Sequence, residues 1–274
     1  MIFKTEILLE GLAFPESPRW HNNKLWFSDM VSCKVMTVDN SGNVETIIKV
    51  PKRPSGLGWL PDGILLIVSM EDRRLLRLES KGFTEIADLS KLATFHCNDM
   101  VVDKLGRAYI GNFGFDYVNQ KPFALAKIIL VKPNGDVQVV ADKMAFPNGT
   151  VITPDDSTLI VSETFGNCLT AFTIMEDGSL TERRIWANLK DLYPDGICLD
   201  ADGAIWVAAP RSGSVIRVLK GGEITHRIKV STQAYACMLG GHDRRTLFVT
   251  TSEENRTNGR IEFIRVDIPG AGLP

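Results

Sequence analysis

Short runs of apolar and β-branched residues, separated by turns rich in glycine, proline, aspartate and asparagine, recur along the whole chain. Residues 65–68 (LLIV), 159–162 (LIVS) and 205–208 (IWVA) are examples, and a turn such as 200–203 (DADG) precedes each of them. Runs of this length and punctuation are typical of β-strands joined in hairpins. Because no stretch shows long helical periodicity, the pattern predicts an all-β protein.

A short phrase opens an apolar strand six times along the chain. The six phrases begin near Glu16, Ser55, Asn98, Asn148, Asp195 and Ala236. The distances between them run from 39 to 50 residues, and a period of this length with several short strands per unit is typical of propeller blades. The sequence therefore predicts a six-bladed β-propeller, with four-stranded antiparallel blades around a central channel.

Composition favours one domain over two. The 274 residues contain no Ser/Gly-rich spacer, no block of like charge and no low-complexity segment at which the chain could be divided. The hydrophobic fraction of 44% is ample for a large core, and closed all-β architectures often hold this many residues. We therefore predict a single β-propeller domain over residues 1–274.

Charge and leader signals narrow the choice of partners. With 31 basic and 33 acidic residues the net charge is -2, which gives no footprint for nucleic acid or an anionic membrane. The first residues lack a basic start and an apolar core, and no apolar run approaches transmembrane length. The five cysteines form no CxxC pattern and are predicted to be small buried hydrophobes. These features predict a cytoplasmic protein that binds a small molecule.

Four of the six phrases present an oxygen-bearing side chain at the same place in the repeat. These are Glu16, Asn98, Asn148 and Asp195. A closed ring of blades would bring them together, and two carboxylates with two amide carbonyls form a hard oxygen set suited to a divalent cation. Two purely structural roles compete with this prediction. Asp-Gly and Asn-Gly are common β-turn dipeptides, and Asn98 could cap a strand by bonding to the backbone.

Several short motifs also carry a family resemblance. In chain order they are residues 15–20 (PESPRW), 98–99 (ND), 147–149 (PNG), 194–196 (PDG), 240–241 (GG) and 259–262 (GRIE). Their order and spacing resemble the regucalcin/gluconolactonase family over nearly the whole chain. The resemblance implies one divalent metal in the channel of a six-bladed propeller and, in most members, lactone hydrolysis. It also implies that a first strand around residues 4–9 pairs with C-terminal strands near 261–266, which removes two sheet edges.

The resemblance assigns roles to individual residues. Glu16, Asn148 and Asp195 match the family's three protein ligands of the metal, and Asn98 matches a channel residue that contacts substrate or metal-bound water. The implied cofactor is one divalent cation, calcium first, with zinc, magnesium or manganese as alternatives. Asp195 would then be both ligand and general base while the metal polarises the lactone carbonyl. This predicts a metal-dependent lactonase, a hydrolase of a cyclic carboxylic ester. A non-catalytic metal- or ligand-binding propeller and a phosphotriesterase-like hydrolase remain the alternatives.

Two features bear on the substrate. Many family members carry an arginine two residues before the channel asparagine, whereas this chain has His96, which cannot supply two parallel donors. A substrate other than a sugar-acid lactone is therefore expected. The segment 111–117 (GNFGFDY) is predicted to be a lid, with Phe113 and Phe115 as an apolar wall and Asp116 orienting substrate hydroxyls. Alternatively, the histidine is an ordinary rim residue, the aromatic rings fold back onto a blade and the aspartate is solvated.

Overall fold

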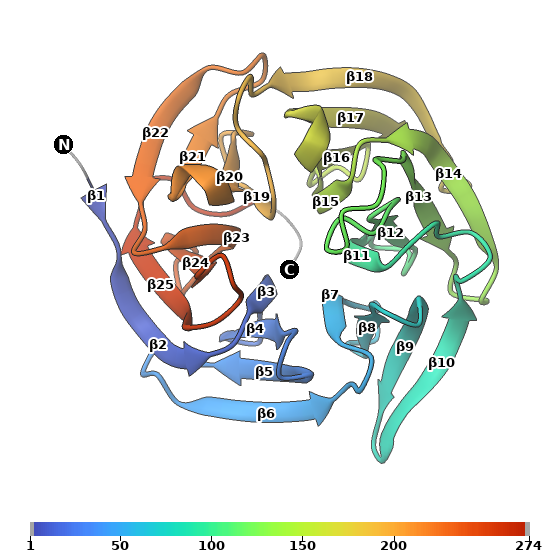
Figure 1. Cartoon of the computed structure of the whole chain (residues 1–274), viewed down its shortest axis with the longest axis horizontal. Helices are drawn as coiled ribbons and strands as arrows, with labels where there is room; N and C mark the ends of the chain where they lie inside the picture. The colour runs from blue at the N-terminus through green and yellow to red at the C-terminus, as the bar shows by residue number, and fades with distance from the viewer. Residues whose placement is uncertain (1–2, 272–274) are drawn as a thin grey trace.

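The structure, a computed structural model that describes residues 3–271, is a ring of six sheets around a central channel (Figure 1). In four of the sheets the strand nearest the channel comes first in the sequence, and successive strands run antiparallel toward the outside. The other two sheets follow the same order but take their outermost strand from the beginning of the described chain. This architecture confirms the predicted six-bladed β-propeller with four-stranded blades.

The strands of each blade follow one another from the channel outward. Blade 1 consists of β3 (Pro15–His21), β4 (Lys24–Asp29), β5 (Lys34–Val38) and β6 (Val44–Lys49). Blade 2 consists of β7 (Pro54–Trp59), β8 (Leu65–Ser69), β9 (Arg74–Glu79) and β10 (Gly82–Asp88). Blade 3 consists of β11 (Cys97–Val102), β12 (Ala108–Asn112), β13 (Ala126–Val131) and β14 (Val137–Met144). Blade 4 consists of β15 (Pro147–Ile152), β16 (Thr158–Glu163), β17 (Cys168–Ile174) and β18 (Leu180–Asn188).

The last two blades also contain strands from the beginning of the described chain. Blade 5 consists of β19 (Ile197–Leu199), β20 (Ile205–Ala209), β21 (Ser214–Val218), β22 (Ile224–Lys229) and the edge strand β1 (Phe3–Lys4). Blade 6 consists of β23 (Gln233–Gly240), β24 (Thr246–Ser252), β25 (Gly259–Arg265) and β2 (Glu6–Leu12). Helical structure in residues 3–271 is limited to two short 3-10 turns, η1 (Thr164–Gly166) and η2 (Pro210–Ser212). No described helix is long and apolar enough to cross a membrane.

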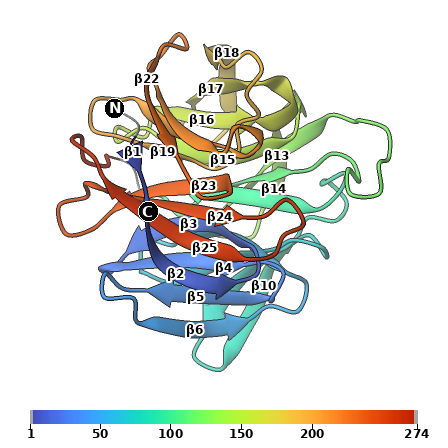
Figure 2. The same cartoon turned by 60° about the vertical axis from the view of Figure 1, so that its left-hand side comes forward.

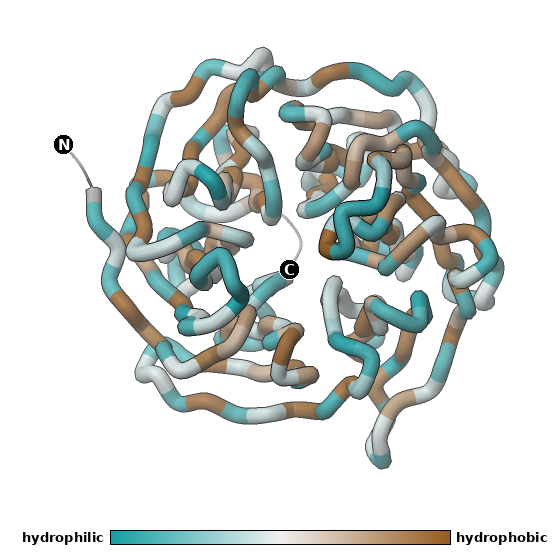
Figure 3. Tube along the Cα trace, in the orientation of Figure 1, coloured by the Kyte–Doolittle hydropathy of each residue, from teal (hydrophilic) through white to brown (hydrophobic). Residues whose placement is uncertain are grey.

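Burial decreases from the channel outward. The inner strands β11 and β15 are buried along their whole length, whereas the outermost strand β6 is largely exposed. Figure 3 shows hydrophobic and hydrophilic positions alternating along the outermost strands, as expected for strands with one face on the core and one in solvent. The core lies between neighbouring blades; for example, Trp20 of blade 1 stacks on Phe248 of blade 6 with ring centroids 5.4 Å apart. Each fully buried side chain of this kind contributes about 1.5–3 kcal/mol.

Five of the six innermost strands carry the same irregularity where they begin. In β11, Asn98 and Asp99 lie between the pairs Cys97↔Asn112 and Met100↔Ile110, so the strand has one residue more than its partner. Equivalent register shifts occur in β3, β7, β15 and β23. An extra residue of this kind bends the strand and turns a side chain out of its regular alternation. The bulge therefore directs one or two side chains of each of these five strands to the channel; β19 pairs with β20 without one.

Two glycines allow the inner strands to approach one another. A Cβ on Gly149 would lie 2.4 Å from the backbone nitrogen of Ile197, and a Cβ on Gly196 would lie 2.3 Å from the Cβ of Ala236. Only glycine fits such close backbone contact. Gly149 lies within strand β15, so the Asn148-Gly149 dipeptide is part of a strand and not a β-turn.

The beginning of the described chain closes the ring. Strand β2 pairs antiparallel with β25, as the resemblance implied (Figure 2). Strand β1, which contains Lys4, instead pairs parallel with β22 of the neighbouring blade. Beside this junction the buried carboxylate of Glu262 accepts hydrogen bonds from the hydroxyls of Thr5, Ser231 and Thr251. It also accepts one from the backbone N–H of Ser231. The same carboxylate thus joins segments that are far apart in the sequence.

The C-terminal segment covers the end of the channel opposite the bulges. Gly270 forms an isolated bridge with Asp200 and donates its N–H to the carbonyl of Arg244 at 2.9 Å. Ala271 donates to the carbonyl of Leu199 at 3.1 Å. These partners lie at or just beyond the far ends of the inner strands β19 and β23. The channel is therefore covered on this side.

Candidate active site

A cavity of about 70 Å³ lies where the inner strands begin, and all six blades contribute to its wall. Its polar lining residues are Glu16, Arg53, Asn98, Asn148, Asp195 and Arg256. The other lining residues are apolar or aromatic: Phe14, Met30, Val31, Met70, Phe113, Tyr117, Phe146 and Tyr235. The structure thus brings together all four oxygen-bearing residues that the repeat predicted.

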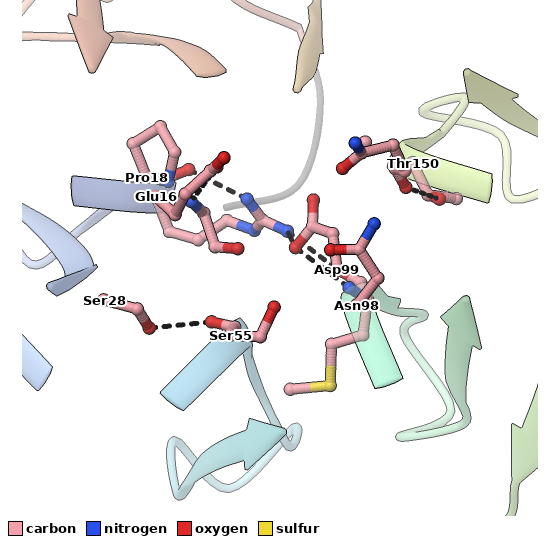
Figure 4. A network of polar contacts seen from close by, with 12 residues as sticks. Glu16, Pro18, Ser28, Ser55, Asn98, Asp99 and Thr150 are labelled. Carbon is pink, nitrogen blue, oxygen red and sulfur yellow. Dashed lines mark hydrogen bonds and ion pairs between the residues drawn. The ribbon is translucent and has the colours of Figure 1, made fainter. Parts of the chain in front are cut away.

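A buried ion pair lies beside the carboxylates of the cavity. Arg19 donates to Asp99 and to the carbonyl of Met100, both at 2.7 Å. Figure 4 shows Asp99 within this network, with Glu16 and Asn98 approaching the channel from different blades. Because Arg19 compensates the charge of Asp99, this aspartate differs from the two carboxylates that line the cavity.

The two amides are oriented by their own NH2 groups. Asn98 donates through Nδ2 to the carbonyl of Pro147 at 3.1 Å, and Asn148 donates through Nδ2 to Oγ1 of Thr164 at 3.3 Å. Thr164 in turn donates to the carbonyl of Pro194 at 2.8 Å. Asn98 does bond to the backbone, as the capping alternative required, but only as a donor. No described residue is found to donate to the carbonyl oxygen of either amide, so each oxygen can accept a hydrogen bond or coordinate a cation.

The two cavity carboxylates are buried with few donors. Glu16 accepts a hydrogen bond from the N–H of Ser17 at 3.1 Å, whereas Oδ1 of Asp195 has no partner among the described residues. Burial raises the pKa of Glu16 to about 8; the charge of Asp99 adds to this rise, and the N–H of Ser17 opposes it. Burial also raises the pKa of Asp195 well above its usual range; the charges of Glu16 and Asp99 add to the effect, and the side-chain amide of Asn148 opposes it. Ionised carboxylates are thus unfavourable here without a cation.

This arrangement fits a divalent metal ion. Two buried acids with raised pKa values, an orphaned carboxylate oxygen and two free amide oxygens are the groups that a hard cation would satisfy. Within residues 3–271 there is no cluster of three or more His, Cys, Asp or Glu side chains that could hold a metal. The candidate ligands do not form such a cluster, because two of the four side chains are amides. Glu16, Asn148 and Asp195 would hold the ion, and Asn98 would complete the set or contact the substrate.

Aromatic residues form one wall of the cavity. Phe113 stacks on Phe146 with ring centroids 4.6 Å apart, and both line the cavity. Phe115 packs behind this wall, against Phe146 and Phe165, and is not among the lining residues. Asp116 accepts hydrogen bonds from Asn119, which lower its pKa, and it also lies outside the lining. The predicted lid therefore contributes Phe113 and Tyr117 directly and Phe115 indirectly.

His96 lies behind the same wall. Its ring stacks on Phe95 with a centroid distance of 4.0 Å and meets Phe113 nearly edge-on at 5.9 Å. The ring is half-buried, and burial lowers its pKa. His96 is not a lining residue, so its contact with the cavity passes through Phe113.

Sequence reasoning missed three polar groups of the wall, namely Arg53, Tyr235 and Arg256. Tyr235 lies in the bulge of blade 6, one residue before Ala236, and therefore occupies the place that Asn148 occupies in blade 4. If the six repeats are aligned at the bulge instead of at the apolar run, Tyr235 falls at the same position as Asn148. Arg256 lies in the connection between β24 and β25, and Arg53 lies in the connection between β6 and β7. Connections of this kind have no counterpart in the repeat pattern, so the repeat carries no signal for them.

The fold and the site together define a six-bladed β-propeller with an oxygen-lined polar site at one end of its channel. Residues 14–253 match the family described as SMP-30/Gluconolactonase/LRE-like region. The match spans well over half of the chain, so the protein belongs to this family, as its motifs predicted.

Named relatives are similar to this chain over nearly their full length. A 6-deoxy-6-sulfogluconolactonase of Pseudomonas putida is 25% identical over 276 residues, which cover 94% of this chain and 93% of the relative. A pentonolactonase of Haloferax volcanii is 24% identical over 287 residues, covering 98% and 96%. The solved structure of a calcium-binding protein, regucalcin, from Agrobacterium tumefaciens aligns with a TM-score of 0.84 at 21% identity, covering 100% of this chain and 98% of the other. At this identity the structural likeness shows the fold alone.

Proposed function

We propose that this protein is a divalent-metal-dependent lactonase that opens a small cyclic ester. The observation that carries the proposal is the convergence of two under-bonded buried carboxylates, Glu16 and Asp195, with the free carbonyl oxygens of Asn98 and Asn148. Relatives similar over nearly the whole chain are named as lactonases, which supports the same reaction class here.

In this proposal Asp195 transfers a proton. When bound, a divalent cation supplies Lewis acidity toward the ester carbonyl oxygen. Oδ1 of Asp195, which has no protein donor among the described residues, accepts a proton from the water that adds to the carbonyl carbon. The ring C–O bond then breaks, and the leaving alkoxide takes the proton back from Asp195. The products are a carboxylic acid and a hydroxyl on one open chain.

The remaining walls bind and enclose the substrate. Phe14, Phe113 and Phe146 present apolar surface to a ring-shaped ligand and reduce the access of bulk water. Fewer competing water molecules strengthen the electrostatic interactions of the site. Asn98, held through its NH2 group, is placed to orient substrate or to complete the oxygen set.

The proposal is tested with chelated protein that is reloaded separately with calcium, zinc, magnesium or manganese. A panel of lactones is assayed by pH-stat, with a phosphotriester panel beside it. We expect metal-dependent acid release from lactones, with metal bound in a one-to-one ratio. Bound metal without any turnover would favour the non-catalytic propeller, and turnover of phosphotriesters alone would favour the phosphotriesterase-like alternative. Lactone hydrolysis that is unaffected by chelation would contradict the metal requirement.

A further inference from the structure

Positive and negative groups occupy different parts of the cavity wall. Glu16 and Asp195 belong to inner strands or their immediate starts, whereas Arg256 comes from the connection between β24 and β25. Two other arginines near the site are paired: Arg19 with Asp99 at 2.7 Å, and Arg53 with Glu71 at 3.2 Å. None of the ion pairs found within residues 3–271 involves Arg256. Among the described residues it is thus the cationic lining group without a bonded carboxylate.

Arg256 is held in place by aromatic contacts. Its guanidinium lies 5.2 Å from the ring centroid of Phe14 and 5.7 Å from that of Tyr117, and it donates to the hydroxyl of Tyr117. These contacts connect the loop after β12 with the loop after β24 across the cavity. Burial lowers the pKa of Arg256, and the nearby charge of Arg53 lowers it further. A second cation beside a half-buried guanidinium is an arrangement that an anion would stabilise.

The charge balance of the site with a divalent cation bound also favours an anion beside Arg256. A divalent cation on Glu16 and Asp195 would compensate both carboxylates, so the weak attraction that Glu16 exerts on Arg256 would be offset. The guanidinium would then be the uncompensated charge of the cavity. A planar guanidinium with several N–H donors matches carboxylate, sulfonate and phosphate groups geometrically.

We infer that Arg256 binds an anionic oxyacid group carried by the lactone substrate at a position away from its ester carbonyl. The inference rests on the proposed function for the lactone ring itself, but the binding subsite can be measured separately. It narrows the substrate class from small lactones to lactones with an acidic substituent. Tyr117 then acts as a positioning residue, because its hydroxyl and ring fix the guanidinium.

The test uses two pairs of small molecules on the metal-loaded full chain. The first pair is a γ-butyrolactone bearing a ring carboxylate and its isosteric carboxamide, compared by kcat/KM. The second pair is the corresponding γ-lactams, which resist hydrolysis, compared by calorimetric affinity. We expect the wild type to favour the carboxylate in both pairs by about tenfold or more, as for loss of a charge-assisted hydrogen bond. Arg256→Gln should remove the preference, and Arg256→Lys should restore part of it.

Arg211 provides a matched control. Its guanidinium lies 4.1 Å from the ring centroid of Tyr193, a similar cation–π contact, but it is not a lining residue of the cavity. Arg211→Gln should leave both preferences unchanged. Thermal melting confirms that each variant is folded. Replacing the ring carboxylate by sulfonate or phosphate then ranks the anions.

The outcomes separate the two proposals. A carboxylate/carboxamide ratio near one in the wild type, or a ratio unchanged in a folded Arg256→Gln variant, overturns the inference while lactone hydrolysis stands. Arg256-dependent binding of the acidic lactam without hydrolysis of any lactone supports the subsite and contradicts the proposed function.

Discussion

Two groups of buried carboxylates in this propeller have opposite surroundings. At the ring closure and on blade 4, Glu262 and Glu163 are almost fully buried and surrounded by donors. Glu262 accepts from three hydroxyls and a backbone N–H, and Glu163 accepts from a hydroxyl, a backbone N–H and a guanidinium. In the channel, Glu16 accepts from one N–H, and Oδ1 of Asp195 accepts from no described residue.

The number of hydrogen-bond donors distinguishes carboxylates that stabilise the fold from carboxylates that are available to bind a ligand. A buried acid with a full set of donors stabilises the fold, because its desolvation is offset by charge-assisted hydrogen bonds. A buried acid without them destabilises the fold until a cation or proton arrives. Substitutions at the two groups should therefore have opposite consequences for activity and stability.

The largest expected effect is on catalysis at Asp195. Asp195→Asn removes the proposed proton acceptor and one anionic ligand, so we expect at least about a hundredfold loss of lactone kcat/KM together with a loss of bound metal. The fold should remain intact, because the substitution removes an unfavourable buried acid. Steady-state assays, elemental analysis and thermal melting of the variant measure the three quantities.

Asp191→Asn makes the same chemical change at an exposed position and should leave all three quantities unchanged. Near-normal turnover in Asp195→Asn would place the base elsewhere. Glu163 would be a poor replacement, because Thr170, Ala145 and Arg183 already engage its carboxylate.

The next effect concerns stability at the ring closure. Glu262→Ala leaves the hydroxyls of Thr5, Ser231 and Thr251 without their acceptor, so we expect a loss of about 2–4 kcal/mol in the free energy of unfolding. Activity per folded molecule should be unchanged. Denaturant titration measures the first quantity, with the exposed Glu223→Ala as control. Equal stability of Glu262→Ala and the control would mean that the carboxylate does not hold the closure.

A smaller effect is the pH dependence of the metal-free protein. The pKa of Glu16 rises from an ordinary value of 4.5 to about 8 on folding, so the folded state binds more protons than the unfolded state between these values. Stability should therefore fall as the pH rises from about 4.5 to 8, by a few degrees in melting temperature. Melting curves of chelated protein check this. Glu16→Gln should flatten the slope, and an equal slope in that variant would contradict the assignment.

The smallest effect is expected at His96. Because its ring reaches the cavity through Phe113, His96→Arg should change substrate preference without removing activity. We expect the kcat/KM for a gluconolactone-type substrate, relative to an aliphatic lactone, to rise a few-fold. The ratio is required, because any change in metal affinity alters both activities together. An unchanged ratio would mean that the departure from the family pattern at position 96 has no effect on specificity.

The fold could be predicted because its repeat is local. Each blade contains its own turns and apolar strands, so spacing alone gave six units, and the positions of Asn98 and Asn148 within those units gave the channel set. The Asn-Gly and Asp-Gly dipeptides also mark the channel ends of the inner strands. Their glycines allow close packing of neighbouring strands and do not form turns.

The rest of the site depends on segments outside the repeat. Arg256 and Tyr117 reach the cavity from two inter-strand connections that meet only after the ring has closed. Their contact joins residues 139 positions apart, and no periodic pattern predicts such a pair. The positions of Phe115 and Asp116 relative to the wall likewise depend on how one loop folds over its blade.

The pairing of β2 with β25 has a consequence for synthesis of the chain. Thr5 and Glu262, which meet beside this pairing, are 257 residues apart in the sequence. Strand β2 therefore leaves the ribosome long before its partner β25 has been synthesised. Blade 6 stays incomplete while the other blades can form. Contacts this distant in sequence slow folding and leave a strand edge exposed. A nascent chain would thus be most open to aggregation or proteolysis just before the last strand emerges.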